Sequence, residues 1–182
     1  MKNKKTELYK IALVSVMTSL ICVIAPISII TPFSIVPVSL STFIIVLSAY
    51  ILGLVQSLIS IILYILIGCC GLPVFSNWTG GVKIILGPTG GYIVGYIFLI
   101  IISGFSFENF ESFYLKIIGS FIAMLVLYCF GTAWLSFTLK ITFVEGLAIG
   151  VFPFIIFDIL KIFLSIYVGE KCKRVLKANG LL

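Results

Sequence analysis

The chain has 182 residues, of which 62% are hydrophobic and 10% are charged, and its mean hydropathy is +1.32. Soluble domains carry about 25% charged residues, so this composition excludes a water-soluble globule and predicts an integral membrane protein. The net charge is +6 and histidine is absent, which leaves no residues for a histidine proton relay or a histidine-ligated zinc site.

The positive charges gather at the two ends of the chain. Eight of the twelve cationic residues flank the hydrophobic body, namely Lys2, Lys4, Lys5, Lys10, Lys171, Lys173, Arg174 and Lys177. This distribution does not form a nucleic-acid-binding stripe, and an excess of lysine and arginine marks the cytoplasmic side of a membrane protein. We therefore expect a multi-pass protein of the cytoplasmic membrane, with both termini in the cytoplasm and an even number of spans.

Six hydrophobic segments approach the length of about 20 residues that a membrane-spanning helix needs. In chain order they cover residues 8–26, 38–54, 55–70, 91–106, 115–138 and 146–169. Gly53 marks a tight inside turn, and 107–114 forms an inside loop. The segment 27–37, with two prolines, and the short stretch holding Lys140 and Glu145 lie outside. The prediction is one all-α membrane domain over 1–182, a bundle of six transmembrane helices.

The longest irregular segment is GLPVFSNWTGGVKIILGPTGG at 71–91, a glycine-rich outer loop between the third and fourth helices. It is too apolar for a solvated loop, so we expect it to fold over the mouth of the bundle as a lid. Asn77 offers a donor and an acceptor, and Trp78 offers a flat apolar wall. Thr89 can cap the following helix, whose free N–H groups suit an anion. The alternative is a plain connecting turn with a helix cap.

Asp158 and Lys161 lie in the apolar stretch FPFIIFDILKIFLSIYVG at 152–169. Their spacing of three places them on one face of a helix. An unpaired charge at the bilayer centre costs roughly 3 kcal/mol, so something must offset that cost. One interpretation is a polar patch that binds a ligand in a cavity, and the other is a structural ion pair. A position about twelve residues into the last span disfavours a lysine that only reaches for the interface.

Several catalytic patterns are absent. The sequence has no GxxxxGK[ST] phosphate loop, no GxSxG, no HExxH and no pair of carboxylates in one span. We therefore expect no enzyme and no cofactor, and any uphill transport must take its energy from a partner or an ion gradient. An intramembrane enzyme that uses Asp158 as a base and a purely structural subunit remain as rivals.

Five stretches of the sequence resemble the BioY family. They are GLPVF at 71–75, GG at 80–81, LGPTGGY at 86–92, FDILK at 157–161 and VPVSLSTF at 36–43. The resemblance runs from about residue 8 to residue 170. BioY proteins are the biotin-specific substrate-capture (S) components of energy-coupling factor (ECF) transporters, so the resemblance implies a six-helix protein that binds biotin from outside.

The resemblance also implies partners and site residues. S components pair with a transmembrane T protein and two ATPase subunits, and small residues of the first helix contact the T protein. Ser15 and Ser19 stand at those positions, although small residues four apart also serve packing within a bundle. The implied biotin-binding residues are Asn77, Trp78, Gly80, Gly81, Thr89, Gly90, Gly91, Tyr92, Asp158 and Lys161.

Biotin offers two ureido N–H donors, a ureido carbonyl, an apolar ring and a carboxylate. In this interpretation Asp158 accepts from the ureido end and Lys161 or Asn77 donates to a carbonyl or carboxylate. Tryptophan and tyrosine side chains form walls for the ring, and backbone amides around Gly90 and Gly91 hold the carboxylate. The alternative is an S component for another vitamin, such as thiamine or riboflavin.

Overall fold

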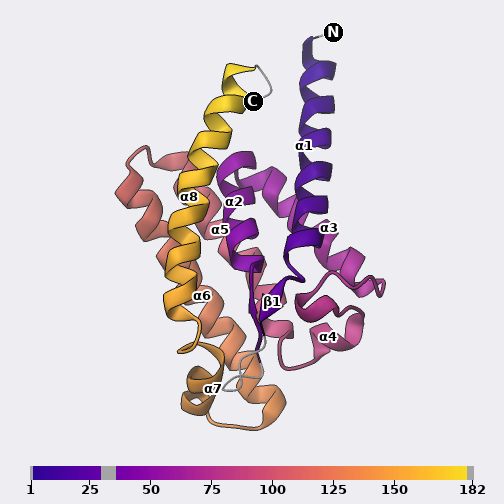
Figure 1. Cartoon of the computed structure of the whole chain (residues 1–182), viewed down its shortest axis with the longest axis vertical. Coiled ribbons are helices and arrows are strands. Elements are labelled where there is room, and N and C mark those ends of the chain that lie inside the picture. The colour runs from indigo at the N-terminus through magenta and orange to yellow at the C-terminus, as the bar shows by residue number, and fades with distance from the viewer. Residues whose placement is uncertain (1, 30–35, 180–182) are drawn as a thin grey trace.

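The computed structural model of the chain describes residues 2–29 and 36–179 (Figure 1). Its helices are α1 (Lys2–Ile24), α2 (Ser41–Leu52), α3 (Leu54–Cys69), α4 (Val82–Leu86), α5 (Gly90–Asn109), α6 (Phe113–Leu139), α7 (Phe143–Gly150) and α8 (Ile155–Ala178). Two short strands, β1 (Ser28–Ile29) and β2 (Val38–Ser39), pair antiparallel, and a 3₁₀ turn, η1, covers Ser76–Trp78.

The expected helical membrane architecture is confirmed in its coarse form. Among the described residues, three helices are long and apolar enough to cross a membrane: Glu7–Ile24 within α1, then α5 and α6. The α7–α8 pair makes a fourth if it is taken as one bent span. The helices α2 and α3 have 12 and 16 residues, shorter than the usual span, so the count of six remains a prediction.

The last predicted span, 146–169, is wrong as a single helix. The chain breaks at 151–154, and α7 and α8 meet there at an angle of 57°. Pro153 has no backbone N–H to donate within a helix, which explains the break. The prediction that Glu145 lies in an outer loop is also wrong, because Glu145 lies in the first turn of α7. There Thr142 and Glu145 form a reciprocal capping box at the start of the helix.

Three connections also differ from their prediction. The inside loop at 107–114 shrinks to 110–112, because α5 and α6 both extend into it. The segment 71–91 is not irregular throughout, since it contains η1 and α4. Of the connection at 27–37, residues 30–35 lie outside the described part of the chain, and the flanking residues form the β1–β2 ladder.

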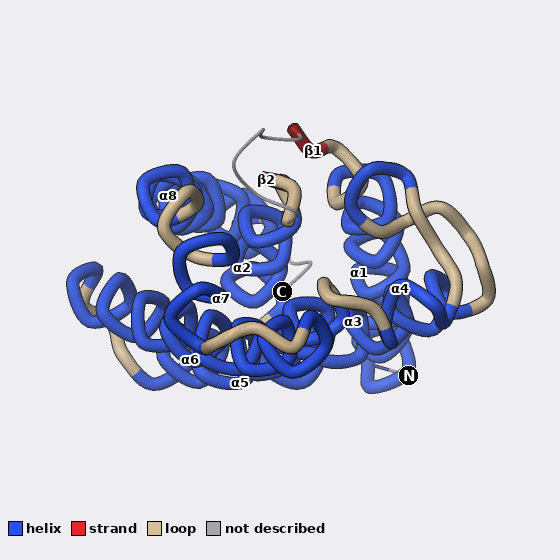
Figure 2. Tube along the Cα trace, turned by 90° about the horizontal axis from the view of Figure 1, so that it is seen from below, coloured by secondary structure: helices blue, strands red, loops and turns tan. Residues whose placement is uncertain are grey.

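The helix α5 is the centre of the bundle. It packs against α6, α2, α3 and α4, and 67% of it is buried, against 22% for the apolar window of α1. Glycines allow these close approaches, because an added Cβ at Gly95 would lie 2.6 Å from Leu127 of α6. Figure 2 shows α1, α3 and α4 grouped on one side of the view and α2, α7 and α8 on the other.

The tight turn predicted at Gly53 separates α2 from α3. Gly53 has φ of +80°, a conformation that disfavours residues with a side chain. The Glu108 carboxylate accepts a hydrogen bond of 2.7 Å from the backbone N–H of Leu54, at the start of α3. The carboxylate thus satisfies an otherwise unpaired donor of this helix end.

The two ends of the bundle differ in character. Figure 1 shows the N-terminal end of α1 and the C-terminal end of α8 at one end of the molecule, with β1, α4 and α7 at the other. The second end holds the irregular connections and the short helices.

Candidate functional site

A cavity of about 200 Å³ opens at the end of the bundle that carries β1, α4 and α7. This volume is below the range of about 300–1,000 Å³ that is usual for small-molecule sites. Its polar lining comes from Ser39, Thr42, Ser76, Asn77, Thr79, Thr89, Tyr92, Tyr96, Tyr128, Asp158 and Lys161. Its apolar lining comes from Val36, Pro37, Phe75, Ile84, Ile93, Leu127, Gly150 and Phe154.

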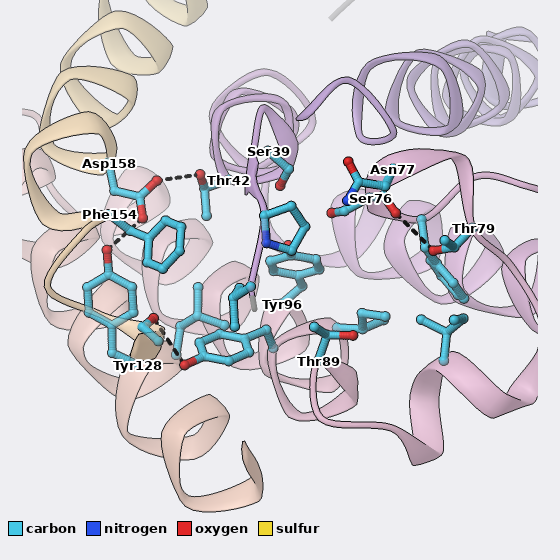
Figure 3. A pocket seen from close by; sticks show the side chains of 18 of the residues that line it. Ser39, Thr42, Ser76, Asn77, Thr79, Thr89, Tyr96, Tyr128, Phe154 and Asp158 are labelled. Carbon is cyan, nitrogen blue, oxygen red and sulfur yellow. Dashed lines mark hydrogen bonds between the residues drawn. The ribbon is translucent and has the colours of Figure 1, made fainter. Parts of the chain in front are cut away.

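Asp158 lies in the first turn of α8, not deep inside one long helix as predicted, because the break at 151–154 restarts the helix at Ile155. A carboxylate in this turn interacts favourably with the helix dipole. The Asp158 side chain is 6% exposed. Its Oδ1 accepts a hydrogen bond of 2.9 Å from Thr42, and its Oδ2 accepts one of 2.6 Å from the Tyr128 hydroxyl (Figure 3).

Lys161 completes this group. Its Nζ lies 2.9 Å from Asp158 Oδ1 and donates a second hydrogen bond of 2.7 Å to the Ser39 carbonyl oxygen. The two interpretations of the charged pair therefore do not exclude each other, because the residues form an ion pair and also line the cavity. An ammonium group carries three donors, of which these contacts use two.

Tyr92 supports the break between α7 and α8. Its hydroxyl donates a hydrogen bond of 3.1 Å to the carbonyl oxygen of Gly150, the last residue of α7. The last carbonyl groups of a helix have no N–H partner within that helix. A Cβ added at Gly150 would lie 2.2 Å from this hydroxyl. The tyrosine ring lines the cavity while its hydroxyl serves the backbone, so Tyr92 offers a ligand a wall.

Asn77 lies at the opposite side of the cavity from Asp158. It has a left-handed backbone conformation, with φ of 59° and ψ of 32°. Its Oδ1 accepts a hydrogen bond of 2.7 Å from the Ser28 hydroxyl, and its backbone N–H lies 2.9 Å from the same hydroxyl oxygen. Ser28, the first residue of β1, therefore holds η1 in place, although Ser28 and Asn77 are 49 residues apart in the sequence.

The cavity thus has polar groups at two ends and apolar walls between them. Figure 3 shows Asp158 and Tyr128 on one side, Asn77 and Thr79 on the other, and Tyr96 between them. Apolar pockets with a few convergent polar groups are the usual sites for small molecules. In the described part of the chain, no group of three or more Cys, Asp or Glu side chains is arranged to hold a metal.

Five of the ten predicted ligand-binding residues line this cavity: Asn77, Thr89, Tyr92, Asp158 and Lys161. The side chain of Thr89 makes no capping hydrogen bond to α5, so its predicted capping role is wrong. The other five do not line it: Trp78, Gly80, Gly81, Gly90 and Gly91. Trp78 is 63% exposed.

Gly80 and Gly90 of this loop pack closely against neighbouring backbone. A Cβ at Gly80 would lie 2.2 Å from the Leu72 carbonyl oxygen, and one at Gly90 would lie 1.6 Å from that of Ile85. The Gly90 N–H donates to the Gly87 carbonyl oxygen, so the amide at this position is not free for an anion. These glycines permit close backbone packing around the cavity.

Sequence reasoning missed Ser39, Thr42 and Tyr128. Each contributes to the group around Asp158 and Lys161, and each comes from a different segment. Tyr128 had a weak signal, since it is a hydroxyl-bearing aromatic residue within the long apolar segment 115–138.

Ser15 and Ser19 do not line this cavity and lie on the exposed face of α1. The hydroxyl of each donates to the carbonyl oxygen four residues earlier, at 2.9 Å in both cases. Because both hydroxyls are hydrogen-bonded within the helix, the two serines act as small residues that would allow another helix to pack closely against α1.

Comparison with known proteins gives consistent matches along the chain. Residues 1–178 match the BioY family. The chain is 34% identical to the biotin transporter BioY of Thermotoga maritima over 87% of this chain and 92% of that protein. It is 29% identical to the biotin transporter BioY2 of Lactococcus lactis, over 95% and 94% of the two chains.

One solved structure is similar to the whole fold. The S-component for biotin from an ECF-type ABC transporter superimposes with a TM-score of 0.85 at 24% identity. The match covers 96% of this chain and 94% of that one. It supports the arrangement of the helices described above.

Proposed function

This chain belongs to the BioY family, and we propose that it captures biotin and takes it up across the cell membrane as the S component of an ECF transporter. The family consists of transporter components and not of enzymes, and the chain is a multi-pass membrane protein. The observation that carries the proposal is the cavity with a polar group at each end and apolar walls between, because biotin has the same order of groups.

The Asp158 end suits the ureido group. A carboxylate has about four acceptor positions, and Thr42, Tyr128 and Lys161 use three of those of Asp158. One position remains for a ureido N–H, and the third donor of Lys161 remains for the ureido carbonyl. The ion pair thus presents one acceptor and one donor side by side, which is the complement of an N–H next to a C=O.

The Asn77 end suits the carboxylate of the valerate chain. Because Asn77 Oδ1 accepts from Ser28, the amide N–H groups of Asn77 are the part of the side chain left for a ligand. The hydroxyls of Thr79 and Thr89 line the same side of the cavity. Phe75 and Tyr96 supply the apolar walls between the two ends, and Trp78 would have to turn inward to join them.

The proposal includes the partners and the topology. A transmembrane T protein and two ATPase subunits would energise transport, with the T protein against Ser15 and Ser19 on the exposed face of α1. Six spans would be formed by α1, α2, α3, α5, α6 and the α7–α8 pair. The common end of α1 and α8 in Figure 1 and the flanking lysines support two cytoplasmic termini.

Two other functions are less well supported. An S component for thiamine or riboflavin would share the fold, but the relatives at about 30% identity are biotin transporters by name. A purely structural role of the Asp158–Lys161 ion pair would not account for the cavity between Asp158 and Asn77.

The test of the site is the substitution Asp158→Asn with biotin titration of the purified protein. The loss of one charge-assisted hydrogen bond and of the ion pair predicts an affinity at least about tenfold weaker. Glu111→Gln, on the exposed connection between α5 and α6, is the matched acid-to-amide control. An unchanged affinity of Asp158→Asn would contradict the placement of the ureido group.

A further inference from the structure

A second cluster of charges lies at the end of the bundle opposite the cavity, around Tyr50 at the end of α2. The Lys116 Nζ donates a hydrogen bond of 3.3 Å to the Tyr50 hydroxyl, and the Lys173 Nζ donates one of 3.2 Å to the Tyr50 carbonyl oxygen. The two ammonium groups lie 5.1 and 5.6 Å from the centre of the Tyr50 ring. Two cations from α6 and α8 thus converge on one buried aromatic side chain.

Neither of these two cations forms a salt bridge in the described part of the chain. The salt bridges there join Lys161 to Asp158 and Arg174 to Glu170. Converging like charges without a salt-bridge partner repel each other. One hydrogen bond and one cation–π contact to Tyr50 hold each ammonium group, and an ammonium group has three donors, so both can still donate to an anion.

The surroundings of Tyr50 add to the positive potential. Lys177 and Lys116 are close enough to Lys173 to repel its charge, and Glu108 is the acid that attracts it. The Glu108 carboxylate is already engaged as the acceptor for the Leu54 N–H. Lys116 also lies near the start of α6, where the helix dipole is positive and the first turn carries no acid.

The position of the cluster identifies the class of anion. The cluster lies between α2, α6 and α8, at the end of the bundle where α8 carries its lysines and arginine (Figure 1). Basic pockets between membrane helices bind the phosphates of anionic lipid headgroups. Tyrosines are enriched at the same depth, at the interface between membrane and water. The apolar surface of α6 around it is exposed, as shown by Leu115 and Ile118, and can contact acyl chains.

We propose that Lys116, Lys173 and Tyr50 form a binding site for the phosphodiester of an anionic membrane lipid, with Lys177 as an outer contribution. The lysines donate to the phosphate oxygens while the Tyr50 ring holds their side chains in place. The site is separate from the cavity and does not depend on the identity of the vitamin.

The test uses the purified full chain in a neutral detergent and follows its thermal unfolding. The probes are a short-chain phosphatidylglycerol, a phosphatidylcholine with the same acyl chains, and inorganic phosphate. The site predicts an increase in the unfolding temperature with phosphatidylglycerol alone. In the double variant Lys116→Gln, Lys173→Gln, the apparent affinity for phosphatidylglycerol should fall about tenfold or more.

The matched control is the double variant Lys83→Gln, Lys140→Gln, which removes the same charge from the other end of the bundle. It should keep the response to phosphatidylglycerol. Circular dichroism and gel filtration verify that both variants fold. Equal stabilisation by phosphatidylcholine, an equal response to free phosphate, or an unchanged response of the Lys116→Gln, Lys173→Gln variant would each overturn the proposal. If the Lys116→Gln, Lys173→Gln variant bound phosphatidylglycerol normally but no longer assembled with the partner proteins, the lipid proposal would be overturned in favour of an acidic segment of a partner.

Discussion

The hydrogen bond between Tyr128 and Asp158 gives a sharp test of the cavity. The Tyr128 hydroxyl donates at 2.6 Å to a carboxylate whose side chain is 6% exposed. Tyr128→Phe removes this donor and leaves the ring in place, so the packing of α6 against α8 is preserved.

The loss in the free energy of unfolding expected for Tyr128→Phe follows from two measured ranges of hydrogen-bond contributions. A hydrogen bond to a charged group contributes about 1.5–3 kcal/mol in soluble proteins. Hydrogen bonds between membrane helices average about 0.6 kcal/mol and reach about 1.7 kcal/mol. Because the acceptor is charged and buried, we expect the top of the membrane range, a loss of about 1.5 kcal/mol, or roughly tenfold in the folding equilibrium.

The assay is unfolding by sodium dodecyl sulfate in mixed micelles, followed by the fluorescence of the two tryptophans, Trp78 and Trp134. The Trp134 indole donates a hydrogen bond of 3.0 Å to the Gly87 carbonyl oxygen, which unfolding would break. Tyr92→Phe is the matched variant with a neutral acceptor, and we expect a loss of about 0.6 kcal/mol. Tyr114→Phe, at a residue 77% exposed, should cause no measurable loss. A loss for Tyr128→Phe no larger than that for Tyr92→Phe would refute the proposed strength of the contact with Asp158.

Two further substitutions test the loop beside the cavity. Ser28→Ala should weaken biotin binding about fivefold, because it removes a hydrogen bond of about 1 kcal/mol that orients Asn77. In titrations with biotin, the exposed control Ser19→Ala should bind as tightly as the parent protein. Equal biotin affinities of the two variants would contradict the orienting role of Ser28. Gly90→Ala should prevent recovery of folded, monodisperse protein, because the alanine Cβ would lie 1.6 Å from the Ile85 carbonyl oxygen. A Gly90→Ala variant with the gel-filtration profile and the unfolding temperature of the parent protein would contradict this close approach.

The charged pair shows what local sequence spacing can predict. Asp158 and Lys161 are three residues apart, so their common face follows from helix geometry alone, and the cost of burial indicates that each needs a partner. The contributions of Thr42 and Tyr128 do not follow in this way. They are 116 and 30 residues from Asp158 in the sequence, and only the packing of α2, α6 and α8 brings them together.

The break between α7 and α8 was readable from local signals that the hydropathy pattern masked. Pro153 and the Thr142–Glu145 capping pattern both mark helix boundaries, but the surrounding apolar run favours one continuous span. The glycines of 71–91 illustrate a different limit. A glycine indicates that something approaches its backbone closely, and at Gly90 the approaching group is the carbonyl of Ile85 rather than a ligand.

The most direct test of the central proposal is titration calorimetry of the purified protein with biotin, with desthiobiotin, thiamine and riboflavin as competitors. We expect saturable, tight binding of biotin that neither thiamine nor riboflavin displaces, and that Asp158→Asn weakens. Folded protein that fails to bind biotin, or that binds thiamine or riboflavin instead, would contradict the assignment of this cavity to biotin.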